Sequence, residues 1–157
     1  MALQKDLLSG NKDQVIRGIK EVAKSGTPAV VHHLLLATFK SGFPEALEEG
    51  KKVLFNIKDQ NAVGELFNAL KGEDFVEYRA VIAASIWEAG LNAEDRLIDL
   101  VEIAVQSDYM TIVEITTIVV NMGTCYINTM LYQRISVLPN TIIIDIYRVS
   151  KAVYTYN

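Results

Sequence analysis

The chain has 157 residues, of which 50% are apolar and 22% are charged, so it can bury a core without disulfides or a structural metal. Its 15 basic and 19 acidic residues give a net charge of −4, which disfavours nucleic acid as a partner. The lone Cys125 excludes an internal disulfide and a cysteine-based zinc site, and we interpret it as a small packing residue.

The sequence shows no targeting or membrane-spanning signal. Residues 1–10 carry one lysine, one aspartate and no apolar run of signal-peptide length. The apolar stretch Thr141–Ile146 is far shorter than the ~20 residues that a bilayer requires. We therefore expect no membrane association and, by elimination, a cytoplasmic location.

The first two predicted helices are marked by capping residues. Asn11 can accept hydrogen bonds from the backbone amides of the next turn, and Gln14, three residues later, completes a capping box. Ser25–Gly26 ends this helix. Thr27–Pro28 then begins a second one, because proline at the first helical position lacks only an N–H that would have no partner there.

The third predicted helix begins at Pro44 and continues to Ile57. Its acidic side chains lie near the positive N-terminal end of the helix dipole, and its lysines lie near the negative C-terminal end. The residues concerned are Glu45, Glu48, Glu49, Lys51, Lys52 and Lys58. This pattern predicts a helix with one buried and one solvated side.

Four further amphipathic patterns follow, each bounded by a polar turn or a glycine. We expect Gly90 to close the fifth helix as a left-handed cap. The predicted elements are a fourth helix from Asp59–Asn61 to Lys71–Gly72, a fifth from Asp74 to Ala89, a sixth opened by Asn92 with Asp95, and a seventh from Met110 to Met122.

The helical patterns recur every 32 to 34 residues, in the segments Val30–Ile57, Ala62–Ala89 and Arg96–Met122. Each segment is a pair of amphipathic patterns, and one pair alone cannot bury its apolar stripe. The period therefore predicts an all-α fold, a solenoid of about three to four antiparallel helix pairs. The apolar rows expected to stack are Val31, Val63 and Leu97; Leu34, Leu66 and Leu100; and Leu54, Ile86 and Val119.

These paired helices resemble HEAT repeats. The runs "LFNIKDQNAVGELFNALKGEDFVEYRAVIAASIWEAGLN" and "DYMTIVEITTIVVNMG" look like the small HEAT-like repeat proteins of Bacteroidetes bacteria. The resemblance covers residues 11–123 and implies a right-handed α-α superhelix of a kind usually used to bind other macromolecules. It brings no catalytic residue. We expect one HEAT-like domain over residues 1–157, with residues 11–123 as its repeat core.

The sequence carries no pattern typical of a catalytic, metal or cofactor site. His32 and His33 are adjacent, so on a helix their side chains diverge and do not converge on one ion. We interpret them as surface or groove-lining residues. There is no H-E-x-x-H pattern, cysteine cluster or phosphate-binding glycine motif. We expect no metal, no cofactor and no enzymatic activity.

The candidate partner-binding surface follows from helix phase. The third, fifth and seventh helices are expected to line the concave side of the solenoid, where tryptophan is a frequent hot-spot residue. The mixture of charges favours a protein or peptide partner over a polyanion. The candidate positions are Glu48, Lys52, Glu77, Arg79, Ala80, Trp87, Glu114 and Thr117.

Residues 124–157 differ in composition from the rest of the chain. They hold four charged residues and five of the seven tyrosines. The spacing of their apolar residues favours helices, although the β-branched run Thr141–Val149 is also compatible with a strand. Three interpretations stay open: a hydrophobic C-terminal cap, an apolar surface for homo-oligomerisation, and an altered reading frame or cloning artefact.

Together these features favour a non-enzymatic scaffold or adaptor that binds a protein or peptide on its concave surface. The alternative is an enzyme, because some HEAT-like bacterial proteins excise alkylated bases or attach chromophores. The acidic charge balance does not supply the basic, aromatic groove that a base-excising relative needs. A self-assembling structural protein, joined through residues 124–157, is the third possibility.

Overall fold

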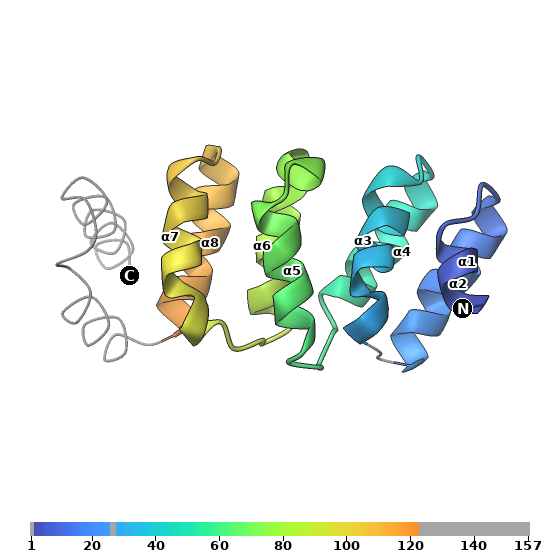
Figure 1. Ribbon diagram of the computed structural model, residues 1–157, viewed down its shortest axis with the longest axis horizontal. Coiled ribbons are helices and arrows are strands. Elements are labelled where there is room, and N and C mark those ends of the chain that lie inside the picture. The colour runs from blue at the N-terminus through green and yellow to red at the C-terminus, as the bar shows by residue number, and fades with distance from the viewer. Residues whose placement is uncertain (1, 26–27, 123–157) are drawn as a thin grey trace, which may run out of the picture. The chain divides into compact units, whose positions relative to one another are not determined.

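A computed structural model describes residues 2–25 and 28–122 of the chain (Figure 1). This described part confirms the all-α prediction, with helices and no strand. The expectations for Cys125 and residues 124–157 lie outside it. Its elements are α1 (Ala2–Leu7), α2 (Lys12–Ser25), η1 (Pro28–Val30), α3 (Val31–Lys40), α4 (Pro44–Leu54), α5 (Ala62–Lys71), η2 (Glu73–Tyr78), α6 (Arg79–Glu88), η3 (Glu94–Arg96), α7 (Leu97–Val105) and α8 (Tyr109–Asn121), the η elements being 3-10 helices.

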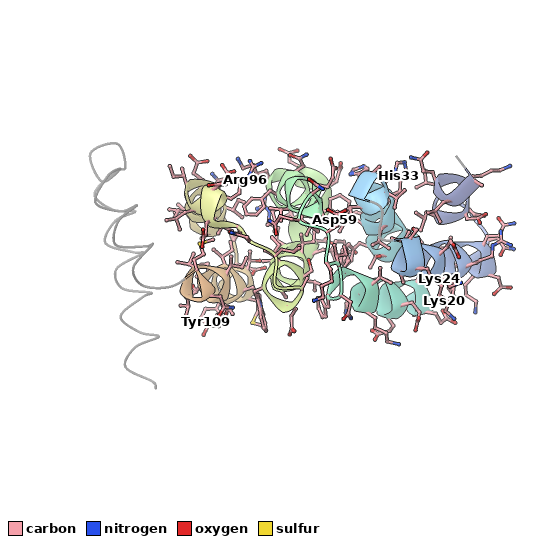
Figure 2. All side chains as sticks on the ribbon, turned by 90° about the horizontal axis from the view of Figure 1, so that it is seen from below. Lys20, Lys24, His33, Asp59, Arg96 and Tyr109 are labelled. Atoms are coloured by element: carbon pink, nitrogen blue, oxygen red, sulfur yellow. The ribbon has the colours of Figure 1, made fainter. Side chains whose placement is uncertain are left out.

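The chain divides into two compact units, residues 1–92 and residues 93–157. In the first unit, α1 packs on α2, α3 on α4, and α5 on α6. In addition, α3 contacts α1 and α5, while α4 contacts α2 and α6, so these helices form two layers (Figures 1 and 2). In the second unit, α7 packs on α8. Among residues 2–25 and 28–122, no helix combines the length and apolar character needed to cross a membrane.

Most members of the predicted apolar rows lie in the core. Burying a side chain of this size contributes roughly 1.5–3 kcal/mol to stability. Val119 is the exception, because it is only half-buried. The confirmed buried members are Val31, Leu34, Leu54, Val63, Leu66 and Ile86 in the first unit and Leu97 and Leu100 in the second.

Asn11 caps the start of α2 as predicted, but Gln14 does not contact the Asn11 backbone amide directly. The Asn11 Oδ1 accepts hydrogen bonds from the backbone amides of Asp13 (3.0 Å) and Gln14 (3.2 Å). The Gln14 side chain, however, accepts from the Ser9 hydroxyl (2.6 Å), and the Ser9 oxygen accepts from the Asn11 amide (3.1 Å). The capping box is therefore closed through Ser9.

The helix before this cap, α1, escaped the sequence analysis. It has only six residues, too few for a helical period to be visible. Its Leu7 is buried against Gly18 of α2, where an added Cβ would lie 3.1 Å from the Leu7 nitrogen. The close approach joins α1 and α2 as a further helix pair.

The predicted fifth helix, Asp74–Ala89, is in fact two elements, η2 and α6. The backbone leaves the helical region at Phe75 (φ −119°, ψ 19°), which is buried with its ring edge-on to the ring of Phe39 at 6.4 Å. No proline or glycine lies between Asp74 and Ala89, so the break carries no residue signal in the sequence. At the other end, Gly90 has a φ of 70° and the Leu91 amide donates to the Ile86 carbonyl, which confirms the predicted left-handed cap.

Other helix bounds shift by a few residues. The α4 helix ends at Leu54 before the predicted Ile57, and the Asn56 side chain donates to the Lys52 carbonyl (2.8 Å) in the last turn. The predicted sixth helix opens as the 3-10 turn η3 before α7. The seventh is confirmed as α8, capped by Asp108, whose carboxylate accepts from the Thr111 amide (2.8 Å). This hydrogen bond lowers the pKa of the Asp108 carboxyl.

Candidate binding groove

A groove of about 760 Å³ lies between the C-terminal halves of α2 and α4 in the first unit. Binding pockets for small ligands span roughly 300–1,000 Å³, so the groove is large enough to hold a short segment of a partner. Its apolar wall comes from both helices and from the start of α3. The wall residues are Val22, Ala23, Val31, Val53 and Ile57.

The wall follows from the amphipathic pattern of the two helices. Val22 continues the buried stripe of α2, and Val31 is buried at the first position of α3. Val53 and Ile57 are half-buried, because they lie where α4 ends and the chain turns toward α5. The groove therefore presents hydrocarbon that the first unit does not fully cover.

The rim of the groove is mostly basic. Four lysines and two carboxylates line it, which sums to +2: Lys20, Lys24, Glu49, Lys52, Lys58 and Asp59. Both helices end here, and lysines near a helix C-terminus partly offset the negative end of the dipole. The chain as a whole carries −4, so the groove has the opposite sign to the protein.

The rim charges on α4 are paired along their own helix. The Lys52 Nζ lies 2.7 Å from the Glu49 Oε1. This hydrogen bond, followed by the attraction between the charges, lowers the pKa of the Glu49 carboxyl and raises the pKa of the Lys52 ammonium. The charge of Lys20, on the other side of the groove, makes a smaller contribution in the same direction to the Glu49 pKa.

The α2 side of the rim is less constrained. Lys20 and Lys24 are four residues apart and so lie on one face of the helix (Figure 2). The Lys24 Nζ lies 3.3 Å from a Glu21 carboxylate oxygen, and the Lys24 side chain is 74% exposed. Within residues 2–25 and 28–122, Lys20 makes no ion pair. At the far end, the Lys58 Nζ donates to the Ala89 carbonyl (2.9 Å).

Only one of the predicted site residues, Lys52, lines this groove. Glu48 is exposed one turn earlier on α4, with an oxygen 4.0 Å from the Lys51 Nζ. Glu77 is exposed on η2, and the neighbouring Arg79 is half-buried. The Arg79 Nε donates to the Leu70 carbonyl (2.7 Å), so this side chain holds the end of α5.

The remaining predicted residues lie elsewhere. Ala80 and Trp87 are half-buried on α6. Glu114 and Thr117 belong to α8 in the second unit, where both are half-buried and the Thr117 hydroxyl donates to the Val113 carbonyl (3.0 Å). Among the predicted positions of the first unit, Lys52 lines the groove and the others do not.

The α2 side of the groove contains none of the residues that were predicted from the sequence. The sequence does indicate a basic face there, because Lys20 and Lys24 are four residues apart near the predicted end of a helix. The repeated segments begin at Val30, however, so α2 was not among the helices predicted to form the binding surface. The groove becomes visible only when α2 is packed beside α4.

The two histidines of α3 differ in their surroundings. His32 is exposed, as predicted, and its ring meets the Phe75 ring edge-on at 6.3 Å. His33 is half-buried, and its Nδ1 has no hydrogen-bond partner in the described part. Within the same residues, no group of three or more histidine, cysteine, aspartate and glutamate side chains is placed to hold a metal ion.

A separate exposed apolar cluster lies on the α7–α8 hairpin of the second unit. Tyr109, labelled in Figure 2, is 76% exposed. The other members are Val105, Met110 and Val113. These side chains carry no charge, so they give less information about a partner than the rim of the groove does.

Comparison with known proteins gives no relative from which a role could be transferred. No protein-family model matches the chain, and neither a curated protein nor a solved structure matches it. The resemblance to HEAT-like repeats stays a prediction from the sequence. The function must therefore be argued from the groove itself.

Proposed function

We propose that this protein is a HEAT-like, non-enzymatic binding module that holds a protein or peptide partner on the layer of α2, α4 and α6. The observation that carries the proposal is the 760 Å³ groove between α2 and α4, with its apolar wall and charged rim. Apolar surface supplies affinity, while a few placed polar groups fix orientation, and binding sites combine the two.

The packing of the first unit supports the HEAT-like interpretation. Three helix pairs follow one another, and each helix contacts its counterpart in the next pair. In the proposed arrangement, such pairs continue as a right-handed superhelix along the chain. Stacked pairs provide an extended surface whose side chains can vary without changing the fold.

The charge pattern of α4 also supports binding. Glu48 pairs with Lys51 and Glu49 with Lys52, each three residues apart on the helix surface. Exposed pairs of this kind contribute only about 0–1 kcal/mol. A partner can therefore replace them with its own charges at small cost, while the wall of the groove gains apolar contact.

The test fills the groove with a large side chain. Ala23 is exposed and belongs to the wall, so Ala23→Trp is expected to block the groove without disturbing the core. A partner is first isolated by affinity capture from cells that make the protein, then purified and titrated by calorimetry. We expect Ala23→Trp to weaken binding by at least about tenfold, or 1.4 kcal/mol.

The matched control is Ala2→Trp, which adds the same side chain at an exposed position of α1. This variant is expected to bind within about twofold of the wild type, since it leaves the groove open. Unchanged binding by a folded Ala23→Trp variant would overturn the proposed site. Failure to capture any macromolecule at several salt concentrations would overturn the proposed function.

A further inference from the structure

We propose that the groove between α2 and α4 recognises an acidic peptide segment, in which carboxylate side chains flank an apolar residue. This inference rests on the proposed function of a peptide-binding module and adds the chemistry of the partner. The proposed ligand is a peptide that bears carboxylates, and an oligonucleotide serves as the competing anion in the experiment below.

The first argument is charge complementarity. The four lysines and two carboxylates of the rim give +2, whereas the chain carries −4. An acidic segment would be drawn to this local region in spite of the overall charge, and opposed charges raise both selectivity and the rate of encounter. A basic segment would meet a like-charged rim.

The second argument is that ammonium groups on both sides are available. On α2, Lys20 has no ion pair within the described residues, and Lys24 is bound only by an exposed pair. On α4, the Lys52 side chain is 68% exposed and pairs within its own helix. A carboxylate entering the groove can therefore meet lysines from two helices without breaking a buried contact.

The third argument is the apolar wall between these lysines. Val53 and Ile57 are half-buried, so part of their hydrocarbon faces solvent at the groove. An apolar side chain of the partner would cover that surface, at roughly 25 cal/mol per Å² removed from water. The groove thus fits a segment with alternating acidic and apolar character better than a polyanion.

The composition of the lining argues against nucleic acid. Among residues 2–25 and 28–122, no arginine and no aromatic residue lines the groove. Arginine forks bind phosphates bidentately and aromatic rings stack on bases, so a nucleic-acid groove normally contains one or both. Glu49 and Asp59 would moreover repel a continuous phosphate backbone.

The charges of residues 124–157 argue against this segment as the occupant. It holds three basic residues, Arg134, Arg148 and Lys151, and one acidic residue, Asp145. Its net charge of +2 has the same sign as the rim. An acidic segment of another protein is the better complement.

The experiment measures binding of fluorescent five-residue peptides to the full-length protein by anisotropy at low ionic strength. The probe is Glu-Glu-Leu-Glu-Glu, compared with Gln-Gln-Leu-Gln-Gln, which removes charge, and Glu-Glu-Ser-Glu-Glu, which removes the apolar side chain. A five-nucleotide oligothymidylate supplies phosphates of comparable charge. We expect the probe to bind at least about fivefold more tightly than each of the other three, and to weaken as salt is added.

Matched double variants locate the effect. Lys20→Gln with Lys24→Gln removes two rim charges, and Lys5→Gln with Lys71→Gln removes two exposed charges on α1 and α5 outside the groove. The first pair is expected to weaken binding of the probe by about four- to tenfold, and the second by less than twofold. Thermal melting followed by circular dichroism verifies that both variants remain folded.

The outcomes separate the two proposals. Equal binding of the glutamate and glutamine peptides, equal losses in the two double variants, tighter binding of the oligonucleotide, or no binding of the probe would each overturn the acidic specificity. If a captured partner is still lost from Ala23→Trp, the peptide-binding module stands with another specificity. If it is not lost, the groove is not the binding site, and only the failure to capture any partner would overturn the binding module.

Discussion

The α3–α4 and α5–α6 pairs place two helices side by side in the same way but hold them with different contacts. In the first pair, Gly50 of α4 lies against the buried Thr38 of α3. In the second, no glycine lies at the crossing, and the Arg79 side chain reaches back to the Leu70 carbonyl. The apolar rows repeat between the pairs, whereas the contacts that fix each pair do not.

This difference shows which positions of a helix pair must stay apolar because they pack against the neighbouring pair. A row such as Leu34 with Leu66 must stay apolar in both pairs, because each member is fully buried. A contact between the two helices of one pair does not touch the next pair. Its residue types can therefore differ from pair to pair. The residue types therefore recur in the apolar rows that join neighbouring pairs, and they do not recur where the two helices of a pair cross.

The largest predicted effect comes from adding a methyl group at the glycine crossing. In Gly50→Ala, the new Cβ would lie 2.7 Å from the Thr38 Cβ, closer than such atoms approach in proteins. Both residues are buried, so the helices must move apart. We expect the free energy of unfolding, measured by urea denaturation, to fall by about 3 kcal/mol, at the upper end for overpacking.

The control is Gly64→Ala on α5, where an added Cβ meets no atom within 4 Å. Alanine favours a helix interior over glycine by roughly 0.8–1 kcal/mol, so this variant is expected to be more stable than the wild type. The same substitution then has opposite signs in the two pairs. A loss of stability in both variants would mean that the glycine crossing is not what distinguishes α3–α4 from α5–α6.

The next effect comes from the arginine of the second pair. Arg79→Met keeps much of the hydrocarbon stem but removes the 2.7 Å hydrogen bond to the Leu70 carbonyl. Because a half-buried carbonyl loses a charged donor, we expect the free energy of unfolding to fall by about 1–2 kcal/mol. The exposed neighbour Glu77→Gln should change it by less than about 0.5 kcal/mol. Equal stability of the two variants would show that the Arg79 hydrogen bond does not stabilise the α5–α6 pair.

Arg79 also shows where helix phase stops being informative. Phase alone made it a candidate for partner binding, since it lies beside exposed residues. Its long side chain instead folds back onto the preceding helix. The phase of a helix predicts which Cα positions face outward, but it does not predict what a flexible side chain of five or more atoms will contact.

The helices themselves were largely predictable, and the exceptions have local causes. The predicted caps Asn11 and Gly90 are confirmed at the start of α2 and the end of α6. The break at Phe75 was not predictable, because no proline or glycine marks it in the sequence. The short α1 was missed, and with it the helix pair whose α2 forms one side of the groove.

The groove was therefore less predictable than the fold. The repeat alignment placed the helix that corresponds to α4 on the candidate surface, and its candidate Lys52 lines the groove. The rest of the rim comes from α2 and from Lys58 and Asp59, which follow α4. A groove between two helices can be predicted only when the two helices are known to be neighbours. The apolar period predicts neighbours only among the repeated segments, and α2 precedes the first of these segments.

The smallest predicted effect concerns a polar contact that joins the α4–α5 connection to the residues after α6. The Gln60 amide donates to the Asn92 carbonyl and accepts from the Asn92 amide (2.9 Å). Both residues are exposed, so water can replace these bonds in part. We expect Gln60→Ala to lower the free energy of unfolding by about 0.5–1 kcal/mol.

A local measurement separates this contact from a general effect. Hydrogen exchange at the Asn92 amide should accelerate in Gln60→Ala, because its acceptor is removed, whereas Gln60→Glu keeps an acceptor oxygen and should preserve much of the protection. The Leu91 amide, bonded to the Ile86 carbonyl in the cap of α6, serves as an internal reference. Acceleration at Leu91 as well as at Asn92 would indicate that the side chain of Gln60 supports the whole end of α6, and the second pair would then depend on this connection as well as on Arg79.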